Sequence, residues 1–126
     1  MPRIRAPWAA VAAGAALMLA VARTVRAQDA AAVNPRTIHV KVDNDRVRVF
    51  EAALAPGEKE QMHSHPSSVV YVIAGGKVRN HGADGTVSEA VLHDGDVLYR
   101  DPITHWAENI GTTTVRLIVL ELKDPR

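Results

Sequence analysis

The sequence predicts an all-β fold, a sandwich or barrel of about eight short strands, for residues 37–126 of the 126-residue chain. Runs of β-branched and aromatic residues follow one another there, and turn signals separate them roughly every 8–12 residues. Beyond the first 27 residues, no window of helical length carries an apolar stripe at a spacing of about 3.6 residues. Together these observations favour an all-β domain over a helical one.

The strands are expected in a regular order along the chain. Ile38, Val40 and Val42 alternate with polar residues, which is typical of a half-buried strand. Asp84-Gly85 is a strong signal for a hairpin turn between two strands. Further strands are expected at residues 47–54, 69–74, 77–80, 86–92, 97–100, 105–110 and 114–123, with turns at 55–58, 75–76, 82–85, 93–96 and 111.

The last expected strand is apolar on both faces. Val115, Leu117 and Val119 share one face, and Ile118 and Leu120 share the other. Such a strand is buried on two sides. Its place is therefore either inside a sandwich or at a contact between two copies of the chain.

The first 27 residues have the layout of a secretory signal peptide. Arg3 and Arg5 precede an apolar run at residues 8–22, and Val25-Arg26-Ala27 offers small residues for cleavage after Ala27. The alternative is a membrane anchor, but the run of about 15 residues is shorter than the ~20 needed to cross a bilayer. We therefore expect export to the periplasm or the medium, without stable membrane insertion after cleavage. Residues 28–36, rich in alanine, are expected to form a flexible tether.

Charge and cysteine content exclude several classes of function. The chain has 15 Lys and Arg against 14 Asp and Glu, and loss of the four arginines within residues 1–27 leaves 11 basic residues. A mildly acidic domain without a basic stripe is not expected to bind nucleic acid. There are no cysteines, so disulfides, thiolate nucleophiles and sulfur metal ligands are excluded.

Three histidines form a candidate metal site. His63 and His65 are separated by one residue, so on a strand their imidazoles project to the same face. Neutral imidazole is a common ligand for divalent metals. His105, which heads a later strand, is the candidate third ligand. Three protein ligands leave coordination positions open for water or substrate.

The residues around these histidines resemble the two motifs of the cupin family. Gly57, five residues, His63-Ser64-His65 and then Gly75 resemble the first motif, and Gly95-Asp96, Pro102 and the segment 105–109 resemble the second. The resemblance covers about residues 47–123. It implies a double-stranded β-helix, that is, a conical barrel or jelly-roll sandwich, with a metal site in its mouth and often a homodimer.

The sequence departs from the family pattern in two places. The first motif of cupins usually carries a glutamate after the second histidine, but the corresponding positions here are Ser68, Val69 or Val70. Ile103 also stands near the usual glycine of the second motif. The sequence thus predicts a site of three neutral histidines that leaves the ion's charge uncompensated. Such a site should bind metal more weakly and favour an anionic ligand.

The sequence leaves three classes of function open, two of which use this metal site and one of which does not. An enzyme would bind a small oxygen-rich molecule on iron, manganese, nickel, copper or zinc, with dioxygenase-like oxidation favoured over isomerase or lyase chemistry. The alternative is a non-catalytic module that binds a small ligand or the metal itself. The third is a metal-free structural barrel. An inward-facing Arg100 would select anionic ligands.

Other polar and aromatic residues are expected outside the site. His39, His81 and His93 are expected to be exposed to solvent. Asn109 is expected to fix the backbone of its turn. Trp106 and Tyr71 are expected in the core or at its rim.

Overall fold

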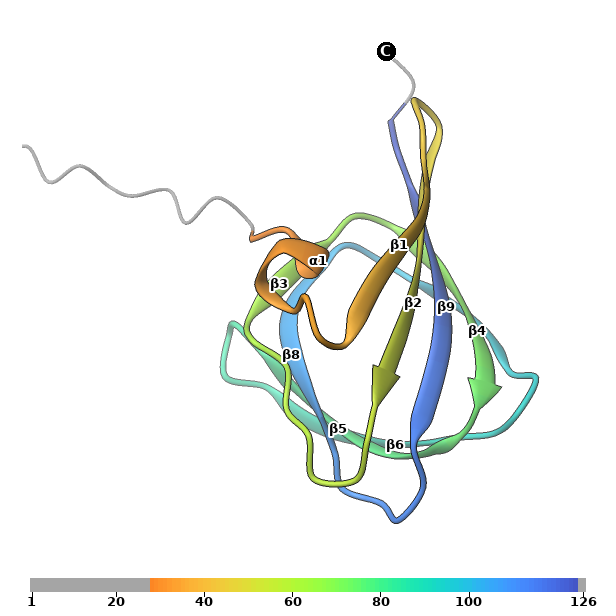
Figure 1. Ribbon diagram of the computed structural model, residues 1–126. Helices are drawn as coiled ribbons and strands as arrows, with labels where there is room; N and C mark the ends of the chain where they lie inside the picture. Colours follow the sequence, from red (N-terminus) through yellow and green to blue (C-terminus); the bar gives the residue numbers. More distant parts are fainter. Residues whose placement is uncertain (1–27, 125–126) are drawn as a thin grey trace, which may run out of the picture.

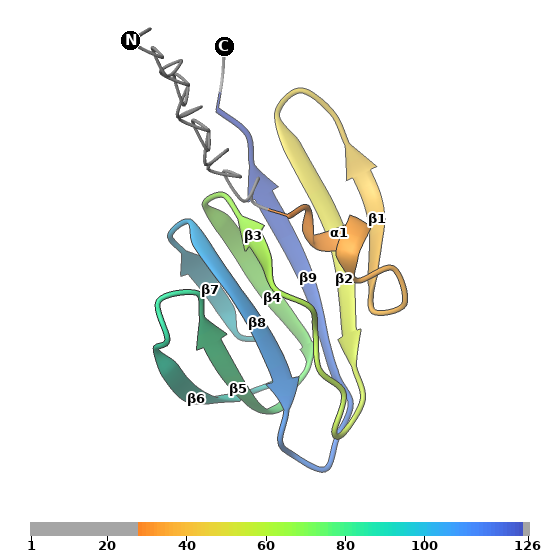
Figure 2. The same cartoon turned by 90° about the vertical axis from the view of Figure 1, so that its left-hand side faces the viewer.

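The computed structural model describes residues 28–124, which form nine strands and one short helix. The strands make two antiparallel sheets that face each other around a common core (Figures 1 and 2). The first sheet has the order β1-β2-β9-β4-β7, with β1 at Ile38–Asp43, β2 at Val47–Leu54, β9 at Val115–Leu122, β4 at Ser68–Ala74 and β7 at Val97–Arg100. The second has the order β3-β8-β5-β6, with β3 at His63–His65, β8 at Ile103–Asn109, β5 at Gly76–Gly82 and β6 at Val87–Leu92.

The strand β9 lies in the middle of the first sheet, hydrogen-bonded to β2 on one side and to β4 on the other. Figure 2 shows it extending between these two strands. Val115 and Val119 on its inner face are buried, whereas Ile118 and Leu120 on its outer face are half-buried. The two-sided apolar pattern thus belongs to the central strand of a sandwich.

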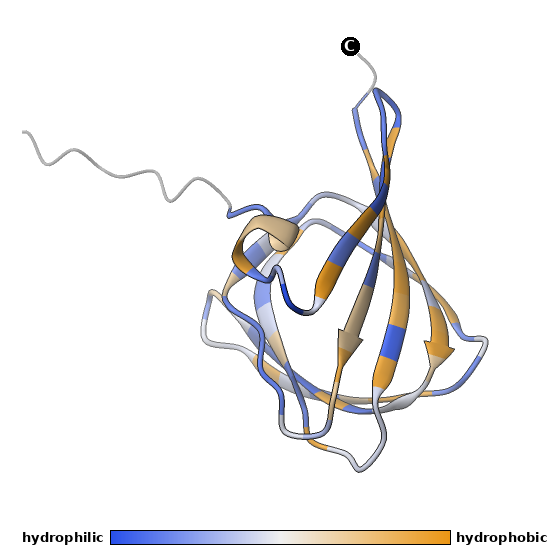
Figure 3. Ribbon diagram, viewed as in Figure 1, coloured by the Kyte–Doolittle hydropathy of each residue, from blue (hydrophilic) through white to orange (hydrophobic). Residues whose placement is uncertain are grey.

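The core fills the space between the sheets with side chains of alternating strand residues. Figure 3 shows hydrophobic segments concentrated on the strands that enclose this space. One buried group lies toward the site end of the core: Ala30, Ile38, Phe50, Val70 and Val119. A second lies beyond it: Val72, Val78, Leu92 and Val115. Burial of this apolar area is the main stabilising term for a domain that has no disulfides.

Three glycines occupy positions where another residue would not fit, either because φ is positive or because there is no space for a Cβ atom. Gly85 and Gly95 adopt positive φ angles of 86° and 84° in the expected turns, a conformation that side chains with a Cβ rarely adopt. At Gly75 the constraint is space, because an added Cβ would lie 2.1 Å from the backbone oxygen of Leu92. These residues let β4, β5, β6 and β7 follow one another with short connections.

Residues 28–36 differ from the predicted flexible tether. The helix α1 at Ala30–Val33 is capped by Asp29, whose side chain accepts a hydrogen bond from the Ala32 N–H at 3.0 Å. Ala30 and Asn34 are buried, and the Ser64 N–H donates to the backbone oxygen of Gln28. The alanine-rich composition was interpreted as a tether, but alanine is both a strong helix former and small enough to pack tightly against β1 and β3.

The predicted signal peptide at residues 1–27 lies outside the described residues. Among residues 28–124, no helix has the length and apolar character needed to cross a membrane.

Candidate metal centre

The strand register brings the three predicted histidines together. On β3, His63 and His65 point to the same side, and the antiparallel pairing with β8 places His105 directly opposite His63. The ring centroids of His63 and His65 lie 4.6 Å apart, and those of His63 and His105 lie 4.9 Å apart. Each ring offers a nitrogen within 4.8 Å of the other two. Two short strands therefore build one cluster of imidazoles facing the interior.

Hydrogen bonds fix the tautomers of two of these rings. The Nδ1 atom of His63 lies 2.7 Å from the backbone oxygen of Gln61, and Nδ1 of His65 lies 2.9 Å from Oε2 of Glu121. Both acceptors favour a proton on Nδ1, and the shorter Gln61 contact outweighs the Asn34 amide, whose Nδ2 lies 3.2 Å from Nδ1 of His63. In this tautomer each Nε2 atom carries a free lone pair. These two Nε2 atoms lie 2.8 Å apart. Two lone pairs facing each other at this distance repel unless a cation lies beside both.

The spacing also matches metal coordination. Metal–imidazole bonds of 2.0–2.1 Å place two ligand nitrogens about 2.9 Å apart at a right angle and about 3.3 Å apart at a tetrahedral angle. The observed Nε2 separation of 2.8 Å is close to the first value. A proton shared by the two rings would satisfy these two atoms, but it would leave the third ring unexplained.

The third ring, that of His105, has no hydrogen-bond partner among the described residues. Its side chain is 3% exposed, and neither Nδ1 nor Nε2 forms a hydrogen bond to any described residue. Burial, followed by the neighbouring His63, His65 and Arg100, lowers the pKa of His105 to about 3. Burial likewise lowers the pKa of His63 to about 4. Both rings are therefore neutral at pH 7, as metal ligation requires, and the cluster fits a divalent ion.

A carboxylate that the sequence analysis did not expect, Glu121, lies behind the three histidines. Glu121 is 5% exposed and accepts the hydrogen bond from His65. Carboxylate behind a ligating histidine orients the ring and makes it a stronger ligand. The sequence contained a signal for this residue: Glu121 has the same parity as Val115, Leu117 and Val119 and therefore belongs to the inner face of β9.

A second carboxylate, Glu60, comes from the irregular segment before β3. Its Oε2 atom lies 3.9 Å from Nε2 of His63 and accepts a hydrogen bond of 3.0 Å from the Ala107 N–H. Burial raises the pKa of Glu60, while this backbone hydrogen bond lowers it. No periodicity marks residues 55–62, so nothing in the sequence placed Glu60 at the site. It nevertheless places a carboxylate beside the histidine cluster.

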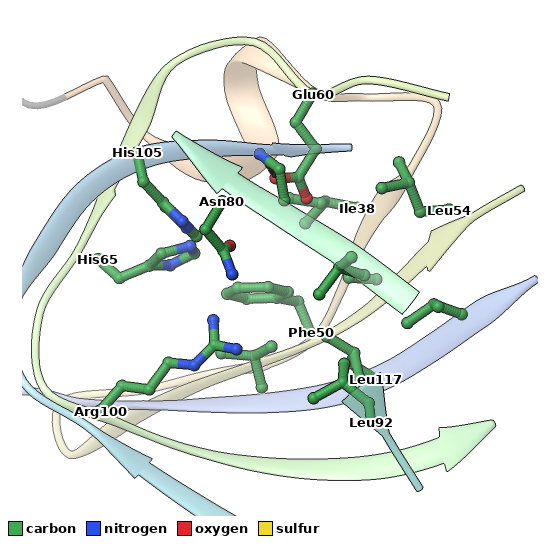
Figure 4. A pocket seen from close by; sticks show the side chains of 15 residues that line it. Ile38, Phe50, Leu54, Glu60, His65, Asn80, Leu92, Arg100, His105 and Leu117 are labelled. Carbon is green, nitrogen blue, oxygen red and sulfur yellow. Dashed lines mark hydrogen bonds between the residues drawn. The ribbon is translucent and has the colours of Figure 1, made fainter. Parts of the chain in front are cut away.

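An inner cavity of about 50 Å³ opens beside the histidines. Figure 4 shows His65, His105, Glu60, Asn80 and Arg100 directed into it from different elements, with Phe50 on its wall. The rest of its lining is apolar and includes Ile38, Leu54, Leu92 and Leu117. Arg100, whose direction the sequence left open, thus faces inward.

The remaining sequence expectations are met in part. Asn109 donates to the backbone oxygens of Leu54 and Thr113 and accepts from the Gly111 N–H, which confirms its role in the turn. His39 and His93 are exposed. His81 is not: its ring stacks on Trp106 with a centroid distance of 3.7 Å and lies 3.0 Å from Glu108. The parity of β5 places its side chain opposite Trp106, away from the three clustered histidines.

Comparison with known proteins identifies the fold. The sequence model of the cupin domain matches residues 50–121. A cupin domain protein from Bordetella pertussis has 26% sequence identity and a TM-score of 0.63, with coverage of 69% of this chain and 92% of that protein. An RmlC-like cupin from Methanocaldococcus jannaschii has 18% identity and a TM-score of 0.55, with coverage of 69% and 81%. These matches confirm the predicted double-stranded β-helix. No curated protein matches the chain.

Proposed function

Because this chain belongs to the cupin domain family, we propose that it holds a divalent metal on His63, His65 and His105 and acts on a small oxygen-rich molecule in the adjoining cavity. The observation that carries the proposal is the arrangement of the ring nitrogens in this cluster. Two Nε2 atoms with free lone pairs lie 2.8 Å apart, and the buried imidazole of His105 beside them forms no hydrogen bond to any residue between 28 and 124. Outside a metal site, this arrangement would be unfavourable.

When bound, the metal would polarise a coordinated oxygen as a Lewis acid or, if it is iron, support dioxygenase-like oxidation. The chain's own residues provide the surroundings. Glu121 holds the ring of His65, and the Gln61 carbonyl holds that of His63. Phe50 stacks on His65 with a centroid distance of 5.8 Å and shields that side of the cluster from water. Glu60 lies where a carboxylate can accept a proton from a ligand in the cavity.

Metal analysis of the protein purified from cells that express the full chain tests the metal site. We expect about one equivalent of iron, manganese, nickel, copper or zinc in the wild type and none in the variant H63A/H65A. The matched control is H39A/H93A, which removes two exposed histidines and should retain the metal. A wild type that stays metal-free after reloading, or an H63A/H65A variant that keeps its metal, would refute the proposal.

Turnover distinguishes the enzyme from a non-catalytic binding module with the same metal site. Glu60 favours the enzyme, because a buried carboxylate that faces the cavity is useful for proton transfer and unnecessary for storage. The metal-loaded protein is incubated with small oxygenated aromatics and acids while dioxygen uptake and products are followed. Binding without consumption of any compound would favour the binding module.

Export of the chain is a further proposal, supported by the three-part pattern of residues 1–27. The intact mass of the purified protein, and its distribution between cytoplasm and periplasm or medium, test it. A mature chain that begins at Gln28 is the expected result. A protein that retains Met1 to Ala27 in the cytoplasm would contradict it.

The homodimer that is frequent among cupins also stays a proposal. Tyr71, Val97 and Tyr99 on the outer face of β4 and β7 are 47%, 66% and 63% exposed, and β7 is an edge strand. Such a group of exposed apolar side chains is a candidate contact surface. Light scattering of the wild type and of V97E/Y99E tests whether a dimer forms and whether this surface carries it.

A further inference from the structure

The last residue of β7, Arg100, places a charged group in the inner cavity without a partner. Its guanidinium points into the space that His65 and His105 also line (Figure 4). Within residues 28–124 it forms no hydrogen bond or ion pair, and the charge of Glu60 reaches it only across the cavity. Burial therefore lowers the pKa of Arg100, since desolvation disfavours the charged form. A partly buried guanidinium is normally paired, so this one is poised for a ligand.

Arg100 also lies between the inner cavity and an outer cleft. Asn80, Arg100 and His105 line the inner cavity and also an outer cleft of about 330 Å³. The cleft continues past Pro102 and Ile103 toward solvent. A ligand that enters through the cleft therefore reaches Arg100 and Asn80 as it reaches the metal cluster. These two side chains can select it by charge and by hydrogen bonding.

Beyond Arg100 and Asn80, the side chains that line the inner cavity are mostly apolar. Phe50, Leu92 and Leu117 line the inner cavity, whose volume is about 50 Å³. Such walls accept a short hydrocarbon group and would leave a second charged group without partners. The space limits the inserted group to a few carbon atoms.

We propose that this pocket recognises a small monocarboxylic acid, with its carboxylate paired to Arg100 and its short apolar body inserted toward Phe50. The inference rests on the proposed function in one respect, namely that the metal on the three histidines would bind an oxygen of the same ligand. A guanidinium presents parallel N–H donors that match the two oxygens of a carboxylate. Asn80 lies beside it and can donate a further hydrogen bond.

The charges around the site agree with an anionic ligand. A divalent ion and Arg100 together carry three positive charges, against which the site places only Glu60 and Glu121. The net charge stays positive whether Glu60 is ionised or protonated. The preference for an anion thus comes from Arg100 as well as from the metal, which itself favours carboxylates. The test must separate the two contributions.

The experiment is calorimetric titration of the purified protein with isobutyrate and with isobutyramide, which has the same shape without the charge. Both are titrated into the zinc-loaded and the metal-free protein. The variants are Arg100→Gln and, as a matched control, Arg36→Gln, which removes the same charge from a side chain that is 83% exposed. Acetate, propionate and benzoate extend the series in size.

We expect isobutyrate to bind more tightly than isobutyramide in the wild type, with or without zinc. R100Q should lose about tenfold or more in isobutyrate affinity in both forms, because a charge-assisted bidentate contact is lost. R36Q should match the wild type, and R100Q should still bind zinc. An unchanged affinity in R100Q, or no binding of any of the four acids by the wild type, would overturn the inference.

Two further comparisons keep the outcomes distinct. A wild type that binds no zinc refutes the metal proposal, while the metal-free titrations still decide the role of Arg100. If R100Q does not fold, as judged from its thermal unfolding, Arg100→Lys replaces it. Lysine keeps the charge without the planar pair of donors, so R100K should bind isobutyrate several-fold more weakly than the wild type. Equal affinities in R100K and the wild type would then count against the proposal.

Discussion

Nδ1 of His65 lies 2.9 Å from Oε2 of Glu121, a residue 56 positions later in the chain. The contact joins the short edge strand β3 to the central strand β9 across the interior of the barrel. It connects the metal-binding motif with the inner face of the sheet that carries most of the core.

Replacement of Glu121 by glutamine tests what this contact does. Glutamine keeps the shape and can still accept a hydrogen bond from His65, but it removes the charge that strengthens the ligand. We expect zinc affinity to fall about 10–100-fold, as is usual for such partners of metal ligands. Competition with a chromophoric chelator measures it. The control is Glu89→Gln, an exposed carboxylate on β6. An affinity in E121Q equal to that in E89Q would show that the charge does not matter.

The depressed pKa values of two histidines predict how the metal-free protein responds to acid. The ordinary histidine pKa of 6.5 falls to about 4 in His63 and to about 3 in His105, in both cases mainly through burial. Between pH 6.5 and these values the unfolded chain binds more protons than the folded one. The free energy of unfolding should therefore be independent of these groups above pH 7.5 and fall as the pH drops through 6 and 5. The limit is about 1.4 kcal/mol per pH unit for each histidine.

Urea unfolding at pH 7.5, 6.0 and 5.0 measures this dependence. The variant His105→Gln should show a shallower loss of stability, because it lacks one of the two groups. Added zinc should shift the loss to lower pH, since metal binding competes with protonation of the folded protein. A stability that is flat from pH 7.5 to 5.0 would contradict the buried, neutral state of both rings.

Periodicity accounts for the part of this fold that was predictable from sequence. The alternation in β1, the β-branched run of β4 and the Asp84-Gly85 turn are local signals, and the structure has strands or a turn at those positions. The predicted half-burial of β1 is wrong beyond Ile38, because Val40 and Val42 are exposed on an edge strand whose register shifts between them. His63 and His65 were predictable as a pair, because residues two positions apart on a strand point to the same face. His105 came from its place in the second motif.

The surroundings of the site were not predictable in the same way. Glu60 enters from a segment without regular structure, and its approach depends on a backbone hydrogen bond with Ala107 in another strand. Glu121 had the correct parity, but the depth at which β9 meets β3 is a property of the folded barrel. The alanine-rich composition of residues 28–36 favoured a flexible tether, so the packed helix α1 was not predicted. Long-range packing, and not local pattern, decided each of these three features.

The packed N-terminal segment gives a prediction at Asn34. Its Oδ1 atom accepts a hydrogen bond of 2.7 Å from the Gln61 N–H, and its Nδ2 atom donates to the backbone oxygen of Ala30. Because Gln61 in turn holds His63, the replacement Asn34→Ala should lower both stability and metal affinity. We expect the free energy of unfolding to fall by about 1–3 kcal/mol, the cost of buried groups left unpaired. Chemical unfolding and zinc competition measure the two effects, and full retention of both would mean that this segment is dispensable.

The buried turn at the end of β8 gives the last prediction. Asn109 is 2% exposed, and its amide donates to the backbone oxygens of Leu54 at 2.8 Å and Thr113 at 2.7 Å. The replacement Asn109→Ala leaves both oxygens without this donor and opens a small cavity, so we expect a loss of about 2–4 kcal/mol.

Asn44 provides the matched control for this prediction. It also bonds a turn, through the N–H groups of Arg46 and Val47, but it is exposed, so water can replace its side chain. The replacement Asn44→Ala should cost about 1 kcal/mol or less. Urea unfolding of both variants measures the difference. Equal losses would show that burial of the Asn109 amide adds nothing to its role, whereas a larger loss in N109A is the expected result for a buried amide that connects the end of β8 with Leu54 of β2 and with Thr113 before β9.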